Sequence, residues 1–267
     1  MQATALRRLS VLPFVVWCLL ASFPPTAAAV PAAFDGSANC NPDRFRVALD
    51  IGHSVRRPGA TSASGRGEHE FNVSLASVVL AALAEGGFRS SFILESPDAE
   101  IPLGERTALA ARENASILLS IHHDSVQPGY LQEVRTGDTV RRFSDRFHGF
   151  SVFVSAENAR AGASRQLGAM LGEEMVQAGF QPSLHHAEAI PGEGRPLLDA
   201  RIGLYRFDGL IILRTARMPA ALLEAGVIVN RSEEQVISAL PTQRRIAAAV
   251  LGAVRRACSS AAFAAMD

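Results

Sequence analysis

The chain has 267 residues, a length that suits one domain with a sizeable hydrophobic core. Its 26 basic residues are all arginine and are balanced by 26 acidic residues, so the formal net charge at pH 7 is zero. A chain this close to neutral lacks the concentrated basic surface that nucleic-acid binding requires, and we expect no nucleic-acid partner.

The first 29 residues have the pattern of a secretory signal peptide that is cleaved from the mature chain. Arg7 and Arg8 precede an apolar run from Leu9 to Phe23, and small residues follow up to Ala29. The run is too short to span a bilayer comfortably, and no second run of sufficient length follows, so we expect no transmembrane segment in the mature chain. We therefore predict export, to the periplasm or as a secreted protein. The general and the twin-arginine export routes both remain open.

Strand and helix patterns alternate along the rest of the chain, after a leader over residues 30–43. The predicted strands are 45–51, 88–94, one ending at His122, 150–155, 209–213 and 221–229. The predicted helices are 72–84, 107–114, 164–178, one with Ser232 as its N-cap, and one after Pro241 that ends near Cys258. This alternation predicts an α/β fold: a single domain over residues 44–258, with a mostly parallel, twisted central sheet flanked by helices, and a tail over 259–267.

Two insertions interrupt the alternation, at residues 125–149 and 181–209. In the first, Phe143 and Phe147 are four residues apart, so a short helix would place both rings on one face. Such a helix is either a lid or regulatory segment near the cleft, or a surface helix that packs its rings onto the core. The second insertion is predicted to be irregular, and it contains His185, His186, Glu188 and Glu193.

Two cysteines follow the predicted signal peptide. Cys40 lies just before the first predicted strand, and Cys258 lies at the end of the last predicted helix. In an oxidising compartment a disulfide between them is the natural hypothesis, and two unpaired thiols are the alternative.

Side chains that bind metals stand at the ends of three predicted elements. His53 follows the first strand, His122 and His123 end another, and Glu68 and Glu70 stand at the start of a helix. Ligands bind at the carboxyl ends of strands in open α/β sheets, where we expect these side chains to meet. Two histidines and one carboxylate suit a catalytic zinc ion. Neighbouring strand residues point to opposite faces, so only one of the two adjacent histidines should reach the metal, and the same choice is open between the glutamates.

Six motifs follow one another between residues 44 and 257. They are Asp50-Ile51-Gly52-His53, Arg57-Pro58-Gly59-Ala60, Glu68-His69-Glu70-Phe71-Asn72, Ile101-Pro102-Leu103-Gly104-Glu105-Arg106, Ser120-Ile121-His122-His123-Asp124 and Met218-Pro219-Ala220-Ala221-Leu222-Leu223-Glu224-Ala225-Gly226. In this order they resemble the motifs of the zinc-dependent N-acetylmuramoyl-L-alanine amidases, bacterial enzymes of cell-wall remodelling and cell separation. The resemblance implies that His53, Glu68 and His122 hold one Zn²⁺ per chain and that Glu224 is the catalytic glutamate.

The resemblance also implies a reaction and its partners. The expected reaction is hydrolysis of the amide bond between N-acetylmuramic acid and L-alanine, with Glu224 transferring a proton from water to the leaving amine. The expected substrate is therefore peptidoglycan, and an activator protein is a further candidate partner. Asp50, Asn72 and Arg214 are candidates for orienting the ligands or the substrate oxygen, and a structural role is the favoured alternative for each of them.

The sequence departs from the family pattern after the first histidine, where Ser54-Val55 replace the usual Gly-Gly. Two other functions are considered. A non-catalytic amidase-like protein, which would regulate or bind the wall, is disfavoured because all three ligands and the catalytic glutamate are retained. A zinc carboxypeptidase is disfavoured because such enzymes place their first histidine and glutamate close together, unlike His53 and Glu68 here.

Overall fold

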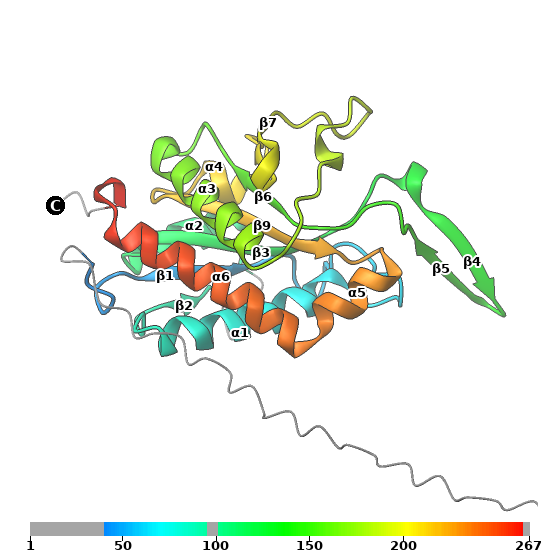
Figure 1. The fold of residues 1–267 in the computed structure, drawn as a ribbon, viewed down its shortest axis with the longest axis horizontal. Coiled ribbons are helices and arrows are strands. Elements are labelled where there is room, and N and C mark those ends of the chain that lie inside the picture. Colours follow the sequence, from blue (N-terminus) through cyan, green and yellow to red (C-terminus); the bar gives the residue numbers. More distant parts are fainter. Residues whose placement is uncertain (1–39, 95–100, 264–267) are drawn as a thin grey trace, which may run out of the picture. The chain divides into compact units, whose positions relative to one another are not determined.

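The structure is a computed structural model that describes residues 40–94 and 101–263. The predicted signal peptide, most of the predicted leader and the last four residues of the tail lie outside the described residues. Within the described part, helices cover both faces of a seven-stranded sheet (Figure 1). The prediction of an α/β fold with a mostly parallel central sheet is confirmed.

The main sheet places the ends of three strands side by side. Its strands are Val47–Ile51 (β1), Phe92–Ile93 (β2), Ile117–Asp124 (β3), Ser151–Val154 (β6), Leu197–Asp199 (β7), Leu204–Arg206 (β8) and Ala220–Val227 (β9). Their order is β2-β1-β3-β9-β6-β8-β7, and the first four run parallel. β6 runs antiparallel to β9 and parallel to β8, and β7 runs antiparallel to β8. In this register Ile51 pairs with Ile121, and the next residue of β3, His122, pairs with Glu224 of β9.

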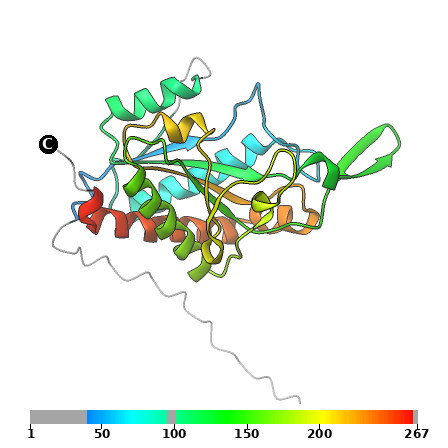
Figure 2. The ribbon, with the colours of Figure 1, turned by 90° about the horizontal axis from the view of Figure 1, so that it is seen from above.

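Helices pack on both faces of this sheet. They are Glu68–Glu85 (α1), Leu103–Arg112 (α2), Ala161–Gln177 (α3), Ile211–Arg214 (α4), Arg231–Ser238 (α5) and Leu240–Ser259 (α6). Figure 2 shows α1, α3 and α6 on one face and α2 and α4 on the other.

Alternation along the strands divides the core into two layers. On β3, Ile117, Leu119 and Ile121 are buried beneath α1, α3 and α6, whereas Leu118 is buried against the α2 and α4 side. Full burial of such a side chain stabilises the fold by about 1.5–3 kcal/mol. By the same alternation, His122 and Glu224 fall on the α2 and α4 side, near the carboxyl ends of their strands.

The prediction of a strand over 209–213 is wrong, because this segment contains the short helix α4. Ile212 and Leu213 are buried, and the backbone amide of Arg214 donates to the carbonyl of Leu210. A short apolar run is compatible with a buried strand and with a buried helical turn, so periodicity could not distinguish the two.

The prediction of a short helix that carries Phe143 and Phe147 on one face is also wrong, and the helical turn in this insertion lies instead at Pro128–Tyr130. Gln132–Thr136 (β4) and Thr139–Phe143 (β5) form an antiparallel hairpin around the two-residue turn Gly137-Asp138. The hairpin projects away from the main sheet (Figure 1) and is exposed along most of its length. Phe143 is buried at its base, 4.0 Å from the guanidinium carbon of Arg231 measured to the ring centroid.

The insertion at 181–209 is less irregular than predicted, because it supplies β7 and β8 to the sheet. Between them and α3 lies a single 3₁₀ turn, His185–Ala187. A further difference concerns the cap of α5. Asn230, not Ser232, is the N-cap, and its side-chain oxygen accepts hydrogen bonds from the backbone amides of Ser232 and Glu233.

A disulfide joins Cys40 to Cys258 across 218 residues. It ties the segment before β1 to the end of α6. Among the described residues, no helix combines the length and the apolar character needed to cross a membrane.

Candidate active site

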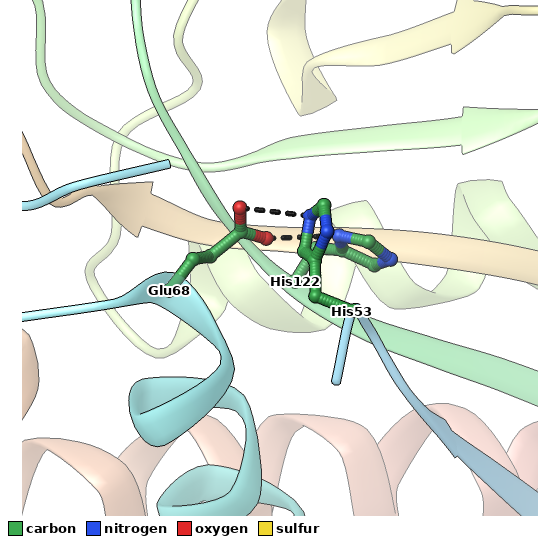
Figure 3. Close-up of side chains that lie close together, drawn as sticks. All are labelled: His53, Glu68 and His122. Carbon is green, nitrogen blue, oxygen red and sulfur yellow. Dashed lines mark hydrogen bonds and ion pairs between the residues drawn. The ribbon is translucent and has the colours of Figure 1, made fainter. Parts of the chain in front are cut away.

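Three side chains from distant parts of the sequence meet at the carboxyl ends of β1 and β3. His53 follows β1, Glu68 is the first residue of α1, and His122 lies on β3. Both carboxylate oxygens of Glu68 face an imidazole (Figure 3): Oε2 is 2.9 Å from Nε2 of His53, and Oε1 is 2.9 Å from Nδ1 of His122. The two rings stand edge to face with centroids 5.0 Å apart. One ligand atom from each residue lies within 4.8 Å of the others, so the three can bind a single ion.

The backbone around this cluster is shaped for close approach. His53 has a φ of 65°, in the left-handed region that non-glycine residues rarely adopt. A Cβ on Gly52 would overlap the ring of His122. A Cβ on Gly59 would lie 2.5 Å from Oε2 of Glu68 and 2.5 Å from Cδ2 of His53, and the φ of this glycine is +78°. The loop therefore packs against the ligands where only glycine fits.

Glu68 is held as an anion. Burial by itself would raise its pKa, but the hydrogen bonds and charges of His122 and His53 outweigh burial and place the pKa well below its usual range. Its Oε2 also accepts from the backbone amide of Ala60 at 3.1 Å, and its Oε1 accepts from Nδ2 of Asn72 at 3.3 Å. A buried, fixed carboxylate of this kind is ready to bind a cation.

The neighbouring histidine and glutamate point elsewhere. His123 is buried on the opposite side of β3, where Nδ1 is 2.8 Å from Oδ1 of Asn72 and the ring centroid is 5.6 Å from that of Phe71. Burial lowers the pKa of His123 to about 3, so the ring is neutral. Glu70 is exposed and pairs with Arg66 at 3.3 Å.

The three residues expected around the cluster have different positions. Asn72 contacts Glu68 and also donates to the carbonyl of Gly52 at 3.2 Å. Asp50 does not contact the cluster directly but pairs with Arg106, which contacts the backbone of His53. Arg214 is exposed on α4, and its guanidinium donates to the carbonyl of Asp208, so the structure does not bring it to the cluster.

Arg106 is a residue of the site that sequence reasoning missed. Its buried guanidinium donates to Oδ1 of Asp50 at 2.9 Å, to the carbonyl of Ile51 at 2.8 Å and to the carbonyl of His53 at 3.1 Å. It therefore fixes the end of β1 and the backbone of the first histidine. The only signal was its place in the motif at 101–106, which does not reveal this contact.

Glu224 stands beside His122 on the neighbouring strand and on the same face of the sheet. Its Oε2 is buried and has no hydrogen-bond partner among the described residues. Burial, followed by the negative charges of Asp124 and Glu68, raises the pKa of this carboxyl group well above its usual value. An orphaned buried carboxyl oxygen is costly unless a ligand or ion normally occupies the space that it faces.

A cavity of about 250 Å³ opens beside Glu224. Polar residues line it: Asp124 at the end of β3, Gln127 just after that strand, and His186, Glu193 and Arg195 of the 181–209 segment. His186 lies between two carboxylates, 2.8 Å from Asp124 and 3.0 Å from Glu193. Burial alone would lower the pKa of His186, but these carboxylates raise it to about 9. No motif pointed to this group.

The residues present fit a zinc ion. Two imidazole nitrogens and one carboxylate oxygen are the donors that catalytic zinc sites use, and these sites keep a further position open. Here the donors converge, while the unpartnered oxygen of Glu224 lies on the adjacent strand. The donor set and its neighbour suit metal-assisted hydrolysis.

Comparison with known proteins points the same way. A family model described as N-acetylmuramoyl-L-alanine amidase matches residues 47–256. The chain is 25% identical over 227 residues to the probable N-acetylmuramoyl-L-alanine amidase AmiB of Haemophilus influenzae, a match covering 75% of this chain and 49% of that protein. This chain thus spans about half the length of that relative.

Solved structures share the fold. The N-acetylmuramyl-L-alanine amidase Ami1 from Mycobacterium smegmatis matches with a TM-score of 0.61 and 20% identity, over 80% of this chain and 96% of that chain. The CwlD amidase from Clostridioides difficile, solved in complex with the GerS lipoprotein, matches with a TM-score of 0.53 and 15% identity, over 80% of this chain and 98% of that chain.

Proposed function

Because the chain belongs to the N-acetylmuramoyl-L-alanine amidase family, we propose that it hydrolyses the amide bond between N-acetylmuramic acid and L-alanine in peptidoglycan, with one catalytic zinc ion. The observation that carries this proposal is the convergence of His53, Glu68 and His122 next to the unpartnered carboxyl oxygen of Glu224. Cell-wall remodelling or the separation of daughter cells would be its biological setting.

In this proposal His53, Glu68 and His122 are the zinc ligands. When bound, the ion supplies Lewis-acid chemistry that polarises the scissile carbonyl and acidifies water. The protein contributes a preformed site. The anion of Glu68 is oriented by Ala60 and Asn72, and Arg106 fixes the carbonyl of His53.

Glu224 is the proposed general base and then the general acid. It takes a proton from the attacking water and delivers it to the amine of L-alanine as the amide C–N bond breaks. The products are the free lactyl carboxylate of the muramic acid and a stem peptide with a free amino terminus. A pKa raised by burial and by the charges of Asp124 and Glu68 suits the later step, in which protonated Glu224 delivers its proton to the amine.

The test is the identity of the bond that is cut. The full mature chain, loaded with zinc, is incubated with purified sacculi, and the soluble products are analysed by mass spectrometry. We expect intact stem peptides that begin with L-alanine, loss of product after chelation, and recovery after zinc is restored. A zinc carboxypeptidase would instead release residues from the peptide ends, and a regulatory or wall-binding protein would release nothing. Either result would overturn the proposal.

Export is proposed as well. The pattern of residues 1–29 and the disulfide between Cys40 and Cys258 both suit an oxidising compartment outside the cytoplasm. Amino-terminal sequencing of the exported protein should give a chain that begins near Val30. An uncleaved amino terminus would contradict this proposal.

An activator protein stays a prediction. If one is needed, the purified chain will release stem peptides slowly from sacculi. Adding an extract of the compartment to which the chain is exported will then raise the rate. If the purified chain is already fully active, the prediction fails.

A further inference from the structure

A second cluster of metal-binding side chains lies outside the set formed by His53, Glu68 and His122. Asp124 ends β3, and His185 and His186 form the 3₁₀ turn of the 181–209 segment. One ligand atom from each lies within 4.8 Å of the others. Both imidazoles direct Nε2 at the same carboxylate oxygen, Oδ2 of Asp124, at 3.4 Å from His185 and 2.8 Å from His186.

The other nitrogen of each ring is already engaged. Nδ1 of His186 is 3.0 Å from Oε2 of Glu193, and Nδ1 of His185 is 2.9 Å from Oγ of Ser183. Histidines that bind metals almost always donate their second ring nitrogen to a carboxylate or another oxygen, because this contact fixes the tautomer and the ring orientation. Both rings therefore have the outer contacts of metal ligands bound through Nε2. An ion there would take the place of the carbonyl oxygen of Ser125, which lies 3.2 Å from Nε2 of His185.

The carboxylates are oriented too. Oδ1 of Asp124 accepts from the backbone amide of Ser125 at 2.7 Å, which leaves Oδ2 to face the imidazoles. Oε1 of Glu193 accepts a hydrogen bond from Nε2 of Gln127 at 2.9 Å, while Oε2 of Glu193 faces His186. The group is thus built in two layers, with inner atoms that converge and outer atoms that hold them.

Burial and charge favour a cation at this place. His185 is 3% exposed and Asp124 is 7% exposed. The rings of Phe153 and Phe147 pack against the histidines at centroid distances of 4.9 and 5.0 Å. Two carboxylates in such surroundings require compensating positive charge. One divalent cation that displaces the proton of His186 would leave two neutral imidazoles and make the cluster electrically neutral.

We propose that Asp124, His185 and His186 form a second divalent-cation site, supported by Glu193 and Ser183. Its two nitrogen donors and one oxygen donor suit zinc better than magnesium or calcium, which prefer oxygen ligands. Because Asp124 and His186 line the cavity beside Glu224, the ion would join the 181–209 segment to the end of β3 at the wall of that cavity. The inference does not require the hydrolase proposal.

The proposal is tested by the number of zinc ions bound per chain, measured by elemental mass spectrometry. The full mature chain is stripped with a chelator, reloaded with zinc chloride and freed of excess metal. We expect two zinc ions in the wild-type chain, one in the variant carrying His185→Ala and His186→Ala, one in the variant carrying His53→Ala and His122→Ala, and none in the combined variant. His148→Ala, which removes an exposed histidine, should keep both ions.

The two sites can fail independently in this experiment. One ion in the wild-type chain that survives His185→Ala and His186→Ala overturns the second site and leaves the first intact. One ion that survives His53→Ala and His122→Ala instead overturns the first site. Circular dichroism checks that each variant is folded.

Two further measurements test the second site without the variant that carries His185→Ala and His186→Ala. Cadmium-113 resonances of the cadmium-loaded wild-type chain should be two, and a single resonance that disappears in the variant carrying His53→Ala and His122→Ala would overturn the second site. Glu193→Gln, which keeps the shape of the supporting side chain, should weaken the second zinc affinity by about 10–100-fold and leave the first unchanged. Equal weakening of both affinities, or of neither, would contradict the assignment.

Discussion

Gly59 limits the space around the proposed zinc ligands. A Cβ at this position would reach both Oε2 of Glu68 and the ring of His53, and its positive φ disfavours any side chain. We expect Gly59→Ala to lower the zinc affinity of the first site by at least about tenfold, as changes next to metal ligands commonly do. A competition titration with a chromogenic chelator measures the affinity.

Gly104→Ala is the matched control, because no atom lies within 4 Å of the place that its Cβ would take. It should bind zinc like the wild-type chain. Equal affinities for the two alanine variants would show that the loop does not constrain the ligands.

Strand ends and a helix start indicate His53, one of His122 and His123, and one of Glu68 and Glu70 without long-range information. The choice of Glu68 over Glu70 needed the family resemblance. The choice between His122 and His123 needed the family resemblance, since alternation says only that one of them points away. Contacts between side chains distant in sequence could not be predicted. Arg106 reaches the carbonyl of His53 across 53 residues, and His186 reaches Asp124 across 62.

The start of α5 depends on one side chain. Asn230 caps the helix through two backbone amides, and its Nδ2 also donates to the carbonyl of Phe147. We expect Asn230→Ala to lower the free energy of unfolding by about 0.5–2 kcal/mol, the usual cost of losing an N-cap. Chemical denaturation of the folded mature chain measures this change.

Ser232→Ala provides the comparison, because the sequence pattern favoured Ser232 as the cap. Its hydroxyl donates to Oδ1 of Asn230, and the helix is capped by Asn230 instead. The loss of free energy of unfolding should therefore be smaller. A larger loss for Ser232→Ala would contradict the observed cap.

The hairpin of β4 and β5 had a recognisable sequence pattern, whereas α4 had none. The turn Gly137-Asp138 between residues of alternating character was a hairpin signal, but the spacing of Phe143 and Phe147 suggested a helix instead. The segment that forms α4 carried no comparable signal. Its four residues are too few for helical periodicity, and only packing against the sheet decides their conformation.

The disulfide constrains the chain as a whole, since 218 residues separate its cysteines. In the chain-entropy model, closing so long a loop stabilises the native state by about 5 kcal/mol, and measured effects are commonly smaller. We expect the variant carrying Cys40→Ala and Cys258→Ala to melt at a lower temperature than the oxidised wild-type chain. Calorimetry in the absence of reductant measures the difference.

Reductant should lower the melting temperature of the wild-type chain and leave that of the double variant unchanged. If reductant has no effect on either protein, the cysteines are not paired in solution.

For the molecule as a whole, alternating strands and helices predict the α/β class and a parallel sheet. The reason is that two strands connected by a helix usually lie parallel to each other in the sheet. The exceptions are at one side of the sheet, where β6 runs antiparallel to β9 and β7 antiparallel to β8. The pairing of β6 with β9 joins residues about 70 positions apart, and β7 and β8 lie in a segment that looked irregular. No short sequence pattern indicates either of these two antiparallel pairings.

The central claim is that Glu224 moves the proton while the three ligands hold the zinc ion. It is tested most directly by the rate at which zinc-loaded Glu224→Gln releases stem peptides from sacculi. Glutamine keeps the shape of the side chain but cannot accept the proton, so we predict full zinc content at the first site and a rate lower by about 10²–10⁴-fold. A rate within a few-fold of the wild-type chain would contradict this account.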